Sequence, residues 1–167
     1  EKGYAEKDPT ADVEGHDACR KVCILASLAF GKHVYPNQVE TEGITNISLE
    51  DVSYIENAGG VIKLLGQIKY INDNEIAAFV SPAVVYNGSQ LASVKDVFNA
   101  ILVRGDAVGD VCFYGPGAGK LPTASAVVAD IIDCAKHSDR KKIFGWGEGS
   151  ENYVVDYKEK IEMPFYV

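Results

Sequence analysis

Apolar residues recur at helical spacing in three stretches of the chain. The first covers about residues 14–30 and ends at Gly31 and Lys32, a typical helix stop. The second, residues 48–59, follows a capping-box variant formed by Ser48 and Asp51. The third, residues 122–136, has a proline in its first turn, where proline is tolerated. The predicted apolar stripe of the first helix consists of Ala18, Val22, Leu25, Leu28 and Ala29.

Short apolar runs between these helices predict four strands. Residues 61–71 and 75–86 are separated by Asn-Asp-Asn, which favours a tight turn and an antiparallel hairpin. Residues 100–105 and 110–115 form a second candidate pair around two glycines. Pro82 lacks a backbone N–H, so we expect it at a sheet edge or a bulge.

The predicted order of elements favours the α+β class. We expect a mostly antiparallel or mixed sheet with helices packed on one face. The regular alternation of strand and helix that marks a doubly wound dinucleotide fold is not seen in the pattern. Residues 137–150 are polar and rich in glycine, which is typical of a linker.

Charge and composition narrow the choice of partners. The chain has 167 residues and a formal net charge of −8, from 24 acidic and 16 basic residues. An acidic chain of this kind does not favour a nucleic-acid or anionic-membrane surface. No apolar run approaches the roughly 18 residues that would span a membrane, and the first residues lack the apolar core of a signal peptide.

Cysteine and histidine spacing indicates a reduced, metal-free chain. The four cysteines, Cys19, Cys23, Cys112 and Cys134, show no metal-ligand spacing, and the three histidines are scattered. We therefore expect buried thiols in a cytoplasmic protein rather than a disulfide or a metal site. The chain begins without Met and stops on an alternating apolar run, so we expect a fragment, a processed product or an engineered segment.

Asp17 and Lys21 lie one helical turn apart on the first predicted helix. One interpretation is a surface i,i+4 ion pair, worth a few tenths of a kcal/mol. The other is a partly enclosed pair where the helix meets a cleft, in which a positioned lysine can handle a proton. The acid-rich segment before it, with Glu6, Asp8 and Asp12, suits an ammonium group or a metal ion, although such segments are usually solvated.

A glycine-rich segment joins the last predicted strand to the last helix. In "FYGPGAGKLPTASA", residues 113–126, glycines at 115, 117 and 119 allow close approach of a backbone. The spacing matches neither a P-loop nor a dinucleotide fingerprint. The segment is then either a tight structural turn or a contact for a ligand that binds mostly elsewhere.

Taken together and in order, these stretches resemble the central region of homoserine dehydrogenase. The first, "GYAEKDPTADVEGHDACRK", resembles the family signature of Gly-Tyr-x-Glu-x-Asp-Pro, an acidic spacer, Gly-x-Asp and a Lys four residues later. "GITNI", "EDV", "GGVIKLLG" and "GPGAGKLPTASAVVADI" follow in the family's order. The resemblance covers residue 1 to about residue 136.

The resemblance implies an activity and a set of site residues. Members of this family reduce L-aspartate 4-semialdehyde to L-homoserine, a step toward threonine, methionine and isoleucine. By motif, Glu6 would hold the substrate's amino group, Asp17 would bind its hydroxyl or aldehyde end, and Lys21 would transfer a proton or polarise the carbonyl. Tyr4 and Asp12 would line the substrate pocket.

The resemblance also implies a cofactor, NADP or NAD, bound mostly by a dinucleotide-binding domain that this chain lacks. Gly119 would touch the nicotinamide cofactor, with Gly117 and Gly115 shaping the approach. The choice between NADP and NAD depends on residues of the missing domain. Ser89 and Gln90 stand where the family usually has His-Pro, which puts a local role for that histidine in doubt.

The implied organisation has three parts. Residues 1–136 would be a substrate-binding and catalytic domain, incomplete at its N-terminus. Residues 137–150 would be a linker, and residues 151–167 the start of a truncated ACT-like regulatory module. We expect the fragment alone to be inactive and the parent enzyme to be a homodimer. The alternative is a non-catalytic dimerisation or binding module, in which the acidic segment and the glycine turn are structural.

Overall fold

The computed structural model describes residues 8–140, 143 and 145–164, and its fold is α+β, as predicted. The helices are α1 (Thr10–Val13), α2 (His16–Phe30), α3 (Leu49–Asn57), α4 (Lys120–Lys136) and α5 (Tyr157–Lys160), with 3₁₀ turns η1 (Pro36–Gln38) and η2 (Gln90–Ser93). The strands are β1 (Glu40–Thr41), β2 (Gly60–Asn72), β3 (Glu75–Tyr86), β4 (Phe98–Gly105) and β5 (Gly109–Pro116). Within the described residues, no helix is long and apolar enough to cross a membrane.

The predicted first hairpin is confirmed, and it forms most of a three-stranded mixed sheet. β2 and β3 pair antiparallel along nearly their whole length, and the two-residue β1 pairs parallel to β3 on its other side. The Asn72 side chain accepts a hydrogen bond from the Asn74 amide in the turn. β1 pairs only with Phe79 and Val80, so Pro82 lies where that side of β3 has no strand partner, as expected for proline.

β3 is buried on both faces. Its residues Ile76, Ala78 and Val80 pack in one cluster with the buried face of α2. The alternate residues, Ala77 and Phe79, point to the opposite face and pack with a second cluster. A continuous apolar run such as "IAAFV" is what a strand covered on both sides requires.

The C-terminal segment covers the second face of the sheet, which differs from the predicted helices on one face only. Tyr153 is 2% exposed and packs on the first face, in the cluster with α2. The Ile76 carbonyl accepts a hydrogen bond from the Val155 amide, and the Ile76 amide donates one to the Tyr153 carbonyl. Tyr157 in α5 stacks on Phe79, with ring centroids 3.9 Å apart. The segment therefore belongs to the packed core, because Tyr153 and Tyr157 are buried on opposite faces of β3.

The second predicted hairpin is confirmed but stands apart from the first. β4 and β5 pair antiparallel as a separate two-stranded sheet instead of extending the first sheet. Phe98 and Tyr114 stack across it with centroids 4.9 Å apart. This separation corrects the expectation of four strands in one sheet.

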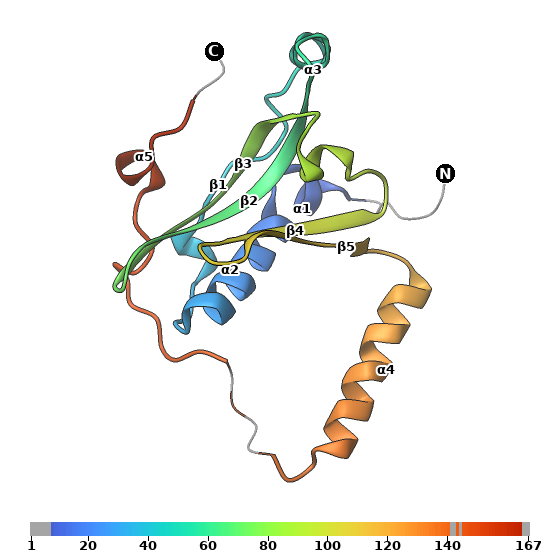
Figure 1. Cartoon of the computed structure of the whole chain (residues 1–167), viewed down its shortest axis with the longest axis vertical. Helices are drawn as coiled ribbons and strands as arrows, with labels where there is room; N and C mark the ends of the chain where they lie inside the picture. Colours follow the sequence, from blue (N-terminus) through green and yellow to red (C-terminus); the bar gives the residue numbers. More distant parts are fainter. Residues whose placement is uncertain (1–7, 141–142, 144, 165–167) are drawn as a thin grey trace.

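The last long helix also departs from the expected packing. Figure 1 shows α4 projecting from the rest of the molecule, and no residue of it is buried. Its apolar side chains are nevertheless numerous, and a helix with an apolar face normally buries that face against another element. The exposed apolar residues of α4 are Leu121, Val127, Val128, Ile131 and Ile132.

A buried hydroxyl joins α2 to the segment that follows it. Ser27 is 1% exposed; its Oγ donates to the Cys23 carbonyl at 2.6 Å and accepts from the Val34 amide at 2.9 Å. Val34 is 1% exposed, and a buried amide left without an acceptor is costly.

We therefore expect Ser27→Ala to lower the free energy of unfolding by about 1–3 kcal/mol. Urea denaturation followed by far-ultraviolet circular dichroism measures the change. Ser53→Ala, at an exposed position of α3, is the matched control and should change stability by less than about 0.5 kcal/mol. Equal effects of the two substitutions would show that the Ser27 hydroxyl has no special role.

Candidate active site

Asp17 and Lys21 form the ion pair that their spacing predicts. The Lys21 Nζ lies 2.6 Å from the Asp17 Oδ2, and both side chains remain accessible, at 59% and 44% exposure. This geometry matches the surface i,i+4 interpretation. The alternative, a partly enclosed pair where the helix meets a cleft, stays a prediction.

The pair lies on the face of α2 that points away from the core. The buried residues of α2 are Cys19, Val22, Cys23, Ala26 and Ser27. Of the predicted stripe, Val22 is buried, but Leu28 is 54% exposed. Leu28 shares the outer face with Asp17 and Lys21, because residues three, four and seven apart lie on one side of a helix.

Ile24 was missed from the sequence, although it lies seven residues after Asp17 and four before Leu28. It is 53% exposed beside the pair. α2 therefore has two apolar faces, one packed on the sheet and one uncovered next to an ion pair. Apolar side chains around a charged pair are typical of the wall of a cleft.

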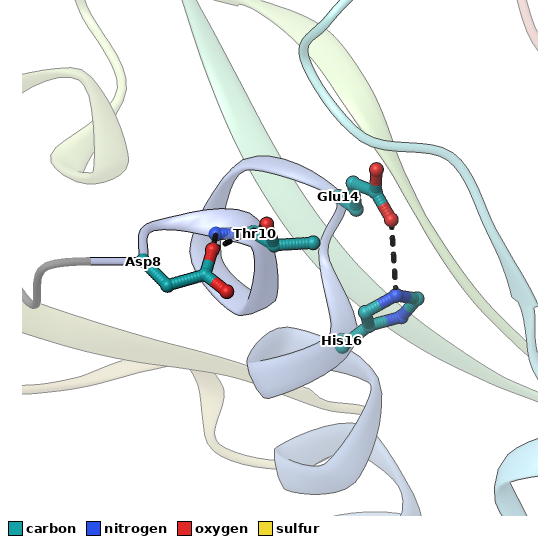
Figure 2. A network of polar contacts seen from close by, with 4 residues as sticks. All are labelled: Asp8, Thr10, Glu14 and His16. Carbon is teal, nitrogen blue, oxygen red and sulfur yellow. Dashed lines mark hydrogen bonds and ion pairs between the residues drawn. The ribbon is translucent and has the colours of Figure 1, made fainter.

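The segment before α2 is held by its own polar contacts (Figure 2). Asp8 accepts bonds from the Thr10 hydroxyl at 2.5 Å and the Thr10 amide at 3.1 Å, which lower the pKa of Asp8. These bonds favour the one-turn helix α1, which lies before the predicted start of the first long helix. Glu14 pairs with the His16 Nε2 at 3.2 Å.

The structure describes only one of the three predicted substrate-binding residues in this segment. Asp12 lies in α1 and is exposed. Tyr4 and Glu6, the predicted pocket and amino-group residues, lie outside the described residues. Their roles therefore stay predictions.

Two glycines fix where α2 begins. Gly15, with a φ of +80°, precedes the helix, and a Cβ on it would lie 3.1 Å from Thr41. A Cβ on Gly43 would lie 2.3 Å from the carbonyl oxygen of Val13, which accepts from the Ile44 amide at 2.8 Å. The chain around Gly43 therefore presses against the turn between α1 and α2 and sets the position of Asp17.

The glycine loop is partly a structural turn. The Gly117 amide donates to the Val97 carbonyl at 2.9 Å, and a Cβ on Gly117 would meet the Asn99 side chain at 1.8 Å. A Cβ on Gly115, by contrast, would meet nothing within 4 Å. Gly119 is the N-cap of α4, with a φ of +119°. The structural turn thus accounts for the glycine at position 117. It does not account for the glycine at position 115, where there is room for another molecule to approach.

The structure unites Asp17 with Lys21, but no recorded contact of the described residues joins this pair to the glycine loop. A hollow of about 370 Å³ lies beside α2 and is lined by His16, Cys19 and Arg20 together with η1 and β1. Another, of about 310 Å³, lies between β1 and residues 154–157. Neither is lined by the pair or the three glycines, so their convergence on one site stays a prediction.

The expectation of buried thiols holds for two cysteines of four. Cys19 and Cys23 are buried in the core, and burial together with the neighbouring Cys19 raises the pKa of the Cys23 thiol to about 12. Cys112 is half-buried and Cys134 is exposed on α4, which corrects the expectation for that residue. Among the described residues, no cluster of three or more His, Cys, Asp or Glu side chains could hold a metal ion.

Comparison with known proteins decides the family. The profile of the homoserine dehydrogenase family matches residues 1–132. The chain belongs to the homoserine dehydrogenase family. It is 48% identical over 139 residues to the enzyme of Corynebacterium glutamicum, covering 81% of this chain and 31% of that one. The homoserine dehydrogenase of Bacillus subtilis is 44% identical over 135 residues, with coverage of 81% and 31%.

Solved homoserine dehydrogenases share the fold. The structure from Thiobacillus denitrificans matches with a TM-score of 0.81 at 40% identity, covering 90% of this chain and 36% of that one. A hyperthermophilic archaeal homoserine dehydrogenase in complex with NADPH matches with a TM-score of 0.59 at 27% identity, with coverage of 78% and 36%. The chain thus spans about a third of the length of the relatives it matches.

The Asp17–Lys21 pair is exposed to solvent, so its loss should change the stability of the chain very little. We expect Asp17→Asn and Lys21→Ala each to change the free energy of unfolding of this chain by less than about 0.5 kcal/mol, since exposed i,i+4 pairs contribute little. Urea denaturation measures both. A loss of 1 kcal/mol or more, as expected for Ser27→Ala, would mean that the pair is structural.

Proposed function

We propose that this chain is the substrate-binding part of an NAD(P)-dependent homoserine dehydrogenase, which interconverts L-aspartate 4-semialdehyde and L-homoserine. The observation that carries the proposal is the Asp17–Lys21 pair on the outer face of α2, beside uncovered Ile24 and Leu28. The pair stands at the acidic and basic positions of the family motif. The pair is expected to contribute little to stability, and it lies beside exposed apolar side chains. Its presence is therefore better explained by a role in the reaction than by a role in folding.

Lys21 is the proposed proton handler. Reduction adds a hydride to the aldehyde carbon, and negative charge develops on the oxygen as the C=O π bond breaks. An ammonium group next to that oxygen stabilises the charge and donates the proton that completes the hydroxyl. In the reverse direction, the neutral amine accepts the hydroxyl proton as the hydride leaves.

Asp17 orients this ammonium group. Its Oδ2 accepts one of the three N–H groups of Lys21 at 2.6 Å, which leaves two for the substrate oxygen. The second carboxylate oxygen of Asp17 can accept a bond from the homoserine hydroxyl. Glu6, Tyr4 and Asp12 are proposed to hold the amino end of the substrate, because carboxylates and a phenol oxygen can accept bonds from its ammonium group.

The glycine loop fits one edge of a dinucleotide cofactor, NADP or NAD, which supplies or accepts the hydride. Gly119 is the N-cap of α4 and has no side-chain cap, and the first turn carries no acidic residue. The first amides of a helix have no acceptor within the helix, so together with the positive end of the helix dipole they suit an electron-rich group. Gly115 leaves room for close approach, while Gly117 serves the turn itself.

We propose that a further part of the enzyme covers the exposed apolar surfaces of α2 and α4. The chain's coverage of about a third of its relatives supports this. A homodimer contact is also proposed, and the apolar side chains exposed on the second sheet support it. These are Phe98, Ile101, Val103, Phe113 and Tyr114.

The proposed division at residues 136 and 150 needs one refinement. Tyr153 and Tyr157 are buried against β3, which favours assigning residues 153–163 to the same packed unit as residues 8–116. The start of an ACT-like module would then lie after this segment.

A non-catalytic dimerisation or binding module is the second candidate. Two observations favour it: the Asn99 contact that explains Gly117, and the exposed aromatic pair Phe98 and Tyr114 on the two-stranded sheet. On this hypothesis the Asp17–Lys21 pair has no chemical role.

A chimeric enzyme separates the two candidates. Residues 1–136 replace the matching segment of the C. glutamicum homoserine dehydrogenase, and homoserine-dependent reduction of NADP⁺ is followed at 340 nm. We expect a folded, active chimera in which Lys21→Ala lowers kcat by roughly 10²–10⁴-fold, the usual range for a lost proton-transfer group.

Two lysine substitutions are the controls. Lys158→Ala is tested in the isolated chain for stability, and Lys95→Ala is tested in the chimera for activity. Lys158 forms another exposed pair, with Glu40, and Lys95 is an exposed lysine outside the proposed site. Near-normal kcat in the Lys21→Ala chimera would remove Lys21 from the mechanism and favour the module hypothesis.

We also expect the purified 167-residue chain to show no turnover of L-homoserine with either NADP⁺ or NAD⁺. The proposed cofactor contacts of this chain, limited to the glycine loop, are too few to bind a dinucleotide. Turnover above the no-enzyme rate that scales with protein concentration, and is lost in Lys21→Ala, would overturn this expectation.

A further inference from the structure

Three aromatic rings meet where the polar segment after α4 crosses the end of α2. His33 stacks on Tyr35, with ring centroids 4.2 Å apart and planes at 17°. Trp146 stands edge-on to His33 at 5.9 Å. Its indole Nε1 donates a hydrogen bond to the His33 Nδ1 at 3.2 Å. We call this hydrogen bond the Trp146 clasp.

Backbone bonds hold the same segment against α2. The His33 amide donates to the Gly147 carbonyl at 2.9 Å, and the Gly147 amide donates to the Gly31 carbonyl at 2.9 Å. A Cβ on Gly149 would lie 1.9 Å from the His33 carbonyl oxygen, so only glycine lets the chain pass this closely. The stretch predicted to be a linker is therefore docked over residues 146–150.

The clasp constrains the protonation of His33. An indole N–H is a donor only, so the bond requires a lone pair on Nδ1. His33 then carries its proton on Nε2 and is neutral. An imidazolium has a proton on both nitrogens and cannot accept the bond.

We propose that the Trp146 clasp is a proton-sensitive fastening of the Trp146 side chain to His33, at the end of α2. It is closed when His33 is neutral and opens as the pH falls and His33 becomes charged. This proposal is independent of the proposed dehydrogenase activity, because it uses no residue of the candidate active site.

Charged groups lie near His33 in the chain. Gly31 ends α2 two residues before His33. The adjacent Lys32 is directed elsewhere, with its Nζ 3.4 Å from the Asp73 carbonyl oxygen and 4.7 Å from the Tyr153 ring.

Other titratable side chains, carboxylates and a tyrosine, belong to the segments next to His33. The docked segment carries the acidic Glu148 and Glu151, and Tyr35 of the η1 side presents its ring face to His33. Protonation of His33 at Nδ1 removes the lone pair that accepts the clasp.

Opening is expected to stop before Tyr153. The Gln38 Nε2 donates to the Ser150 carbonyl at 2.8 Å, and the Ile76 amide bonds to the Tyr153 carbonyl at 3.0 Å. These bonds involve no histidine, so the C-terminal segment on β3 stays in place. The Gly147 backbone bonds do not involve the imidazole either, so the proton-sensitive contact is that of the Trp146 side chain with His33.

Nuclear magnetic resonance tests the proposal on the ¹⁵N-labelled 167-residue chain. Trp146 is the only tryptophan, so a single indole N–H signal reports the clasp. From pH 8 to pH 5.5, the range over which histidines change charge, we expect that signal to move upfield. After correction for intrinsic rates, its exchange with water should rise about five- to tenfold, as for loss of one ordinary hydrogen bond.

The imidazole signals of His33 are followed in the same samples. Above the transition they should show the Nε2–H form, and their midpoint should coincide with that of the indole signal. The Ile76 and Val155 amides should keep their protection, which separates local opening from acid unfolding. A fixed indole signal, two different midpoints, or parallel loss of protection at Ile76 would each overturn the proposal.

Matched variants identify the histidine responsible. His33→Asn places an amide oxygen near the position of Nδ1 and cannot be protonated, so the indole step should disappear. His16→Asn and His137→Asn, which change the other two histidines, should retain it. An unchanged step in His33→Asn would overturn the proposal, and the midpoint comparison in the wild-type chain decides the matter if that variant does not fold.

Discussion

Burial of β3 on both faces is the constraint on which the rest of the fold depends. A strand whose successive residues are all apolar has no solvent face, so both sides of it must be covered. α2 covers one side through Val22 and Ala26, and Tyr157 covers the other by stacking on Phe79. The position of α2, and with it that of Asp17 and Lys21, follows from this packing.

That packing fixes the orientation of the ion pair. Because α2 buries the face through Cys19 and Ala26, the side with Asp17, Lys21, Ile24 and Leu28 must point outward. The proposed site residues are consequently presented by a helix whose inner face is anchored. Gly43, pressed against the Val13 carbonyl, holds the start of the same helix.

The sequence predicted local structure well where short-range chemistry determines it. The Asn72–Asn74 turn and the Ser48–Asp51 capping box both appear in the structure, with the Asp51 amide bonded to the Ser48 Oγ at 3.1 Å. Helix boundaries differ by only a few residues, since caps and glycines mark them. The i,i+4 pairing of Asp17 and Lys21 follows from helical geometry alone.

Longer-range packing was less accessible from the sequence. Periodicity cannot tell which of two apolar faces of α2 meets the sheet, so Leu28 was placed inside and Ile24 was overlooked. Nor does a hairpin pattern state whether β4 and β5 join the first sheet. The polar segment after α4 contacts His33, which lies more than a hundred residues before Trp146 in the chain. The sequence indicated this contact only by a single tryptophan among glycines.

Site assignments depended on motif order more than on geometry. The resemblance that assigned Glu6, Asp17 and Lys21 led to the family that the comparisons established. The structure adds that the pair faces outward, and exposed pairs of this kind contribute little to stability. The cleft around the pair, with a wall supplied from elsewhere in the enzyme, is a proposal.

The most direct test of this account is a crystal structure of the complete enzyme that contains this chain, with L-homoserine and an oxidised nicotinamide cofactor bound. The account predicts the homoserine hydroxyl within 3.2 Å of the Lys21 Nζ or an Asp17 carboxylate oxygen. It also predicts Ile24 and Leu28 covered. A ligand bound elsewhere, with the Asp17–Lys21 pair still open to solvent, would contradict it.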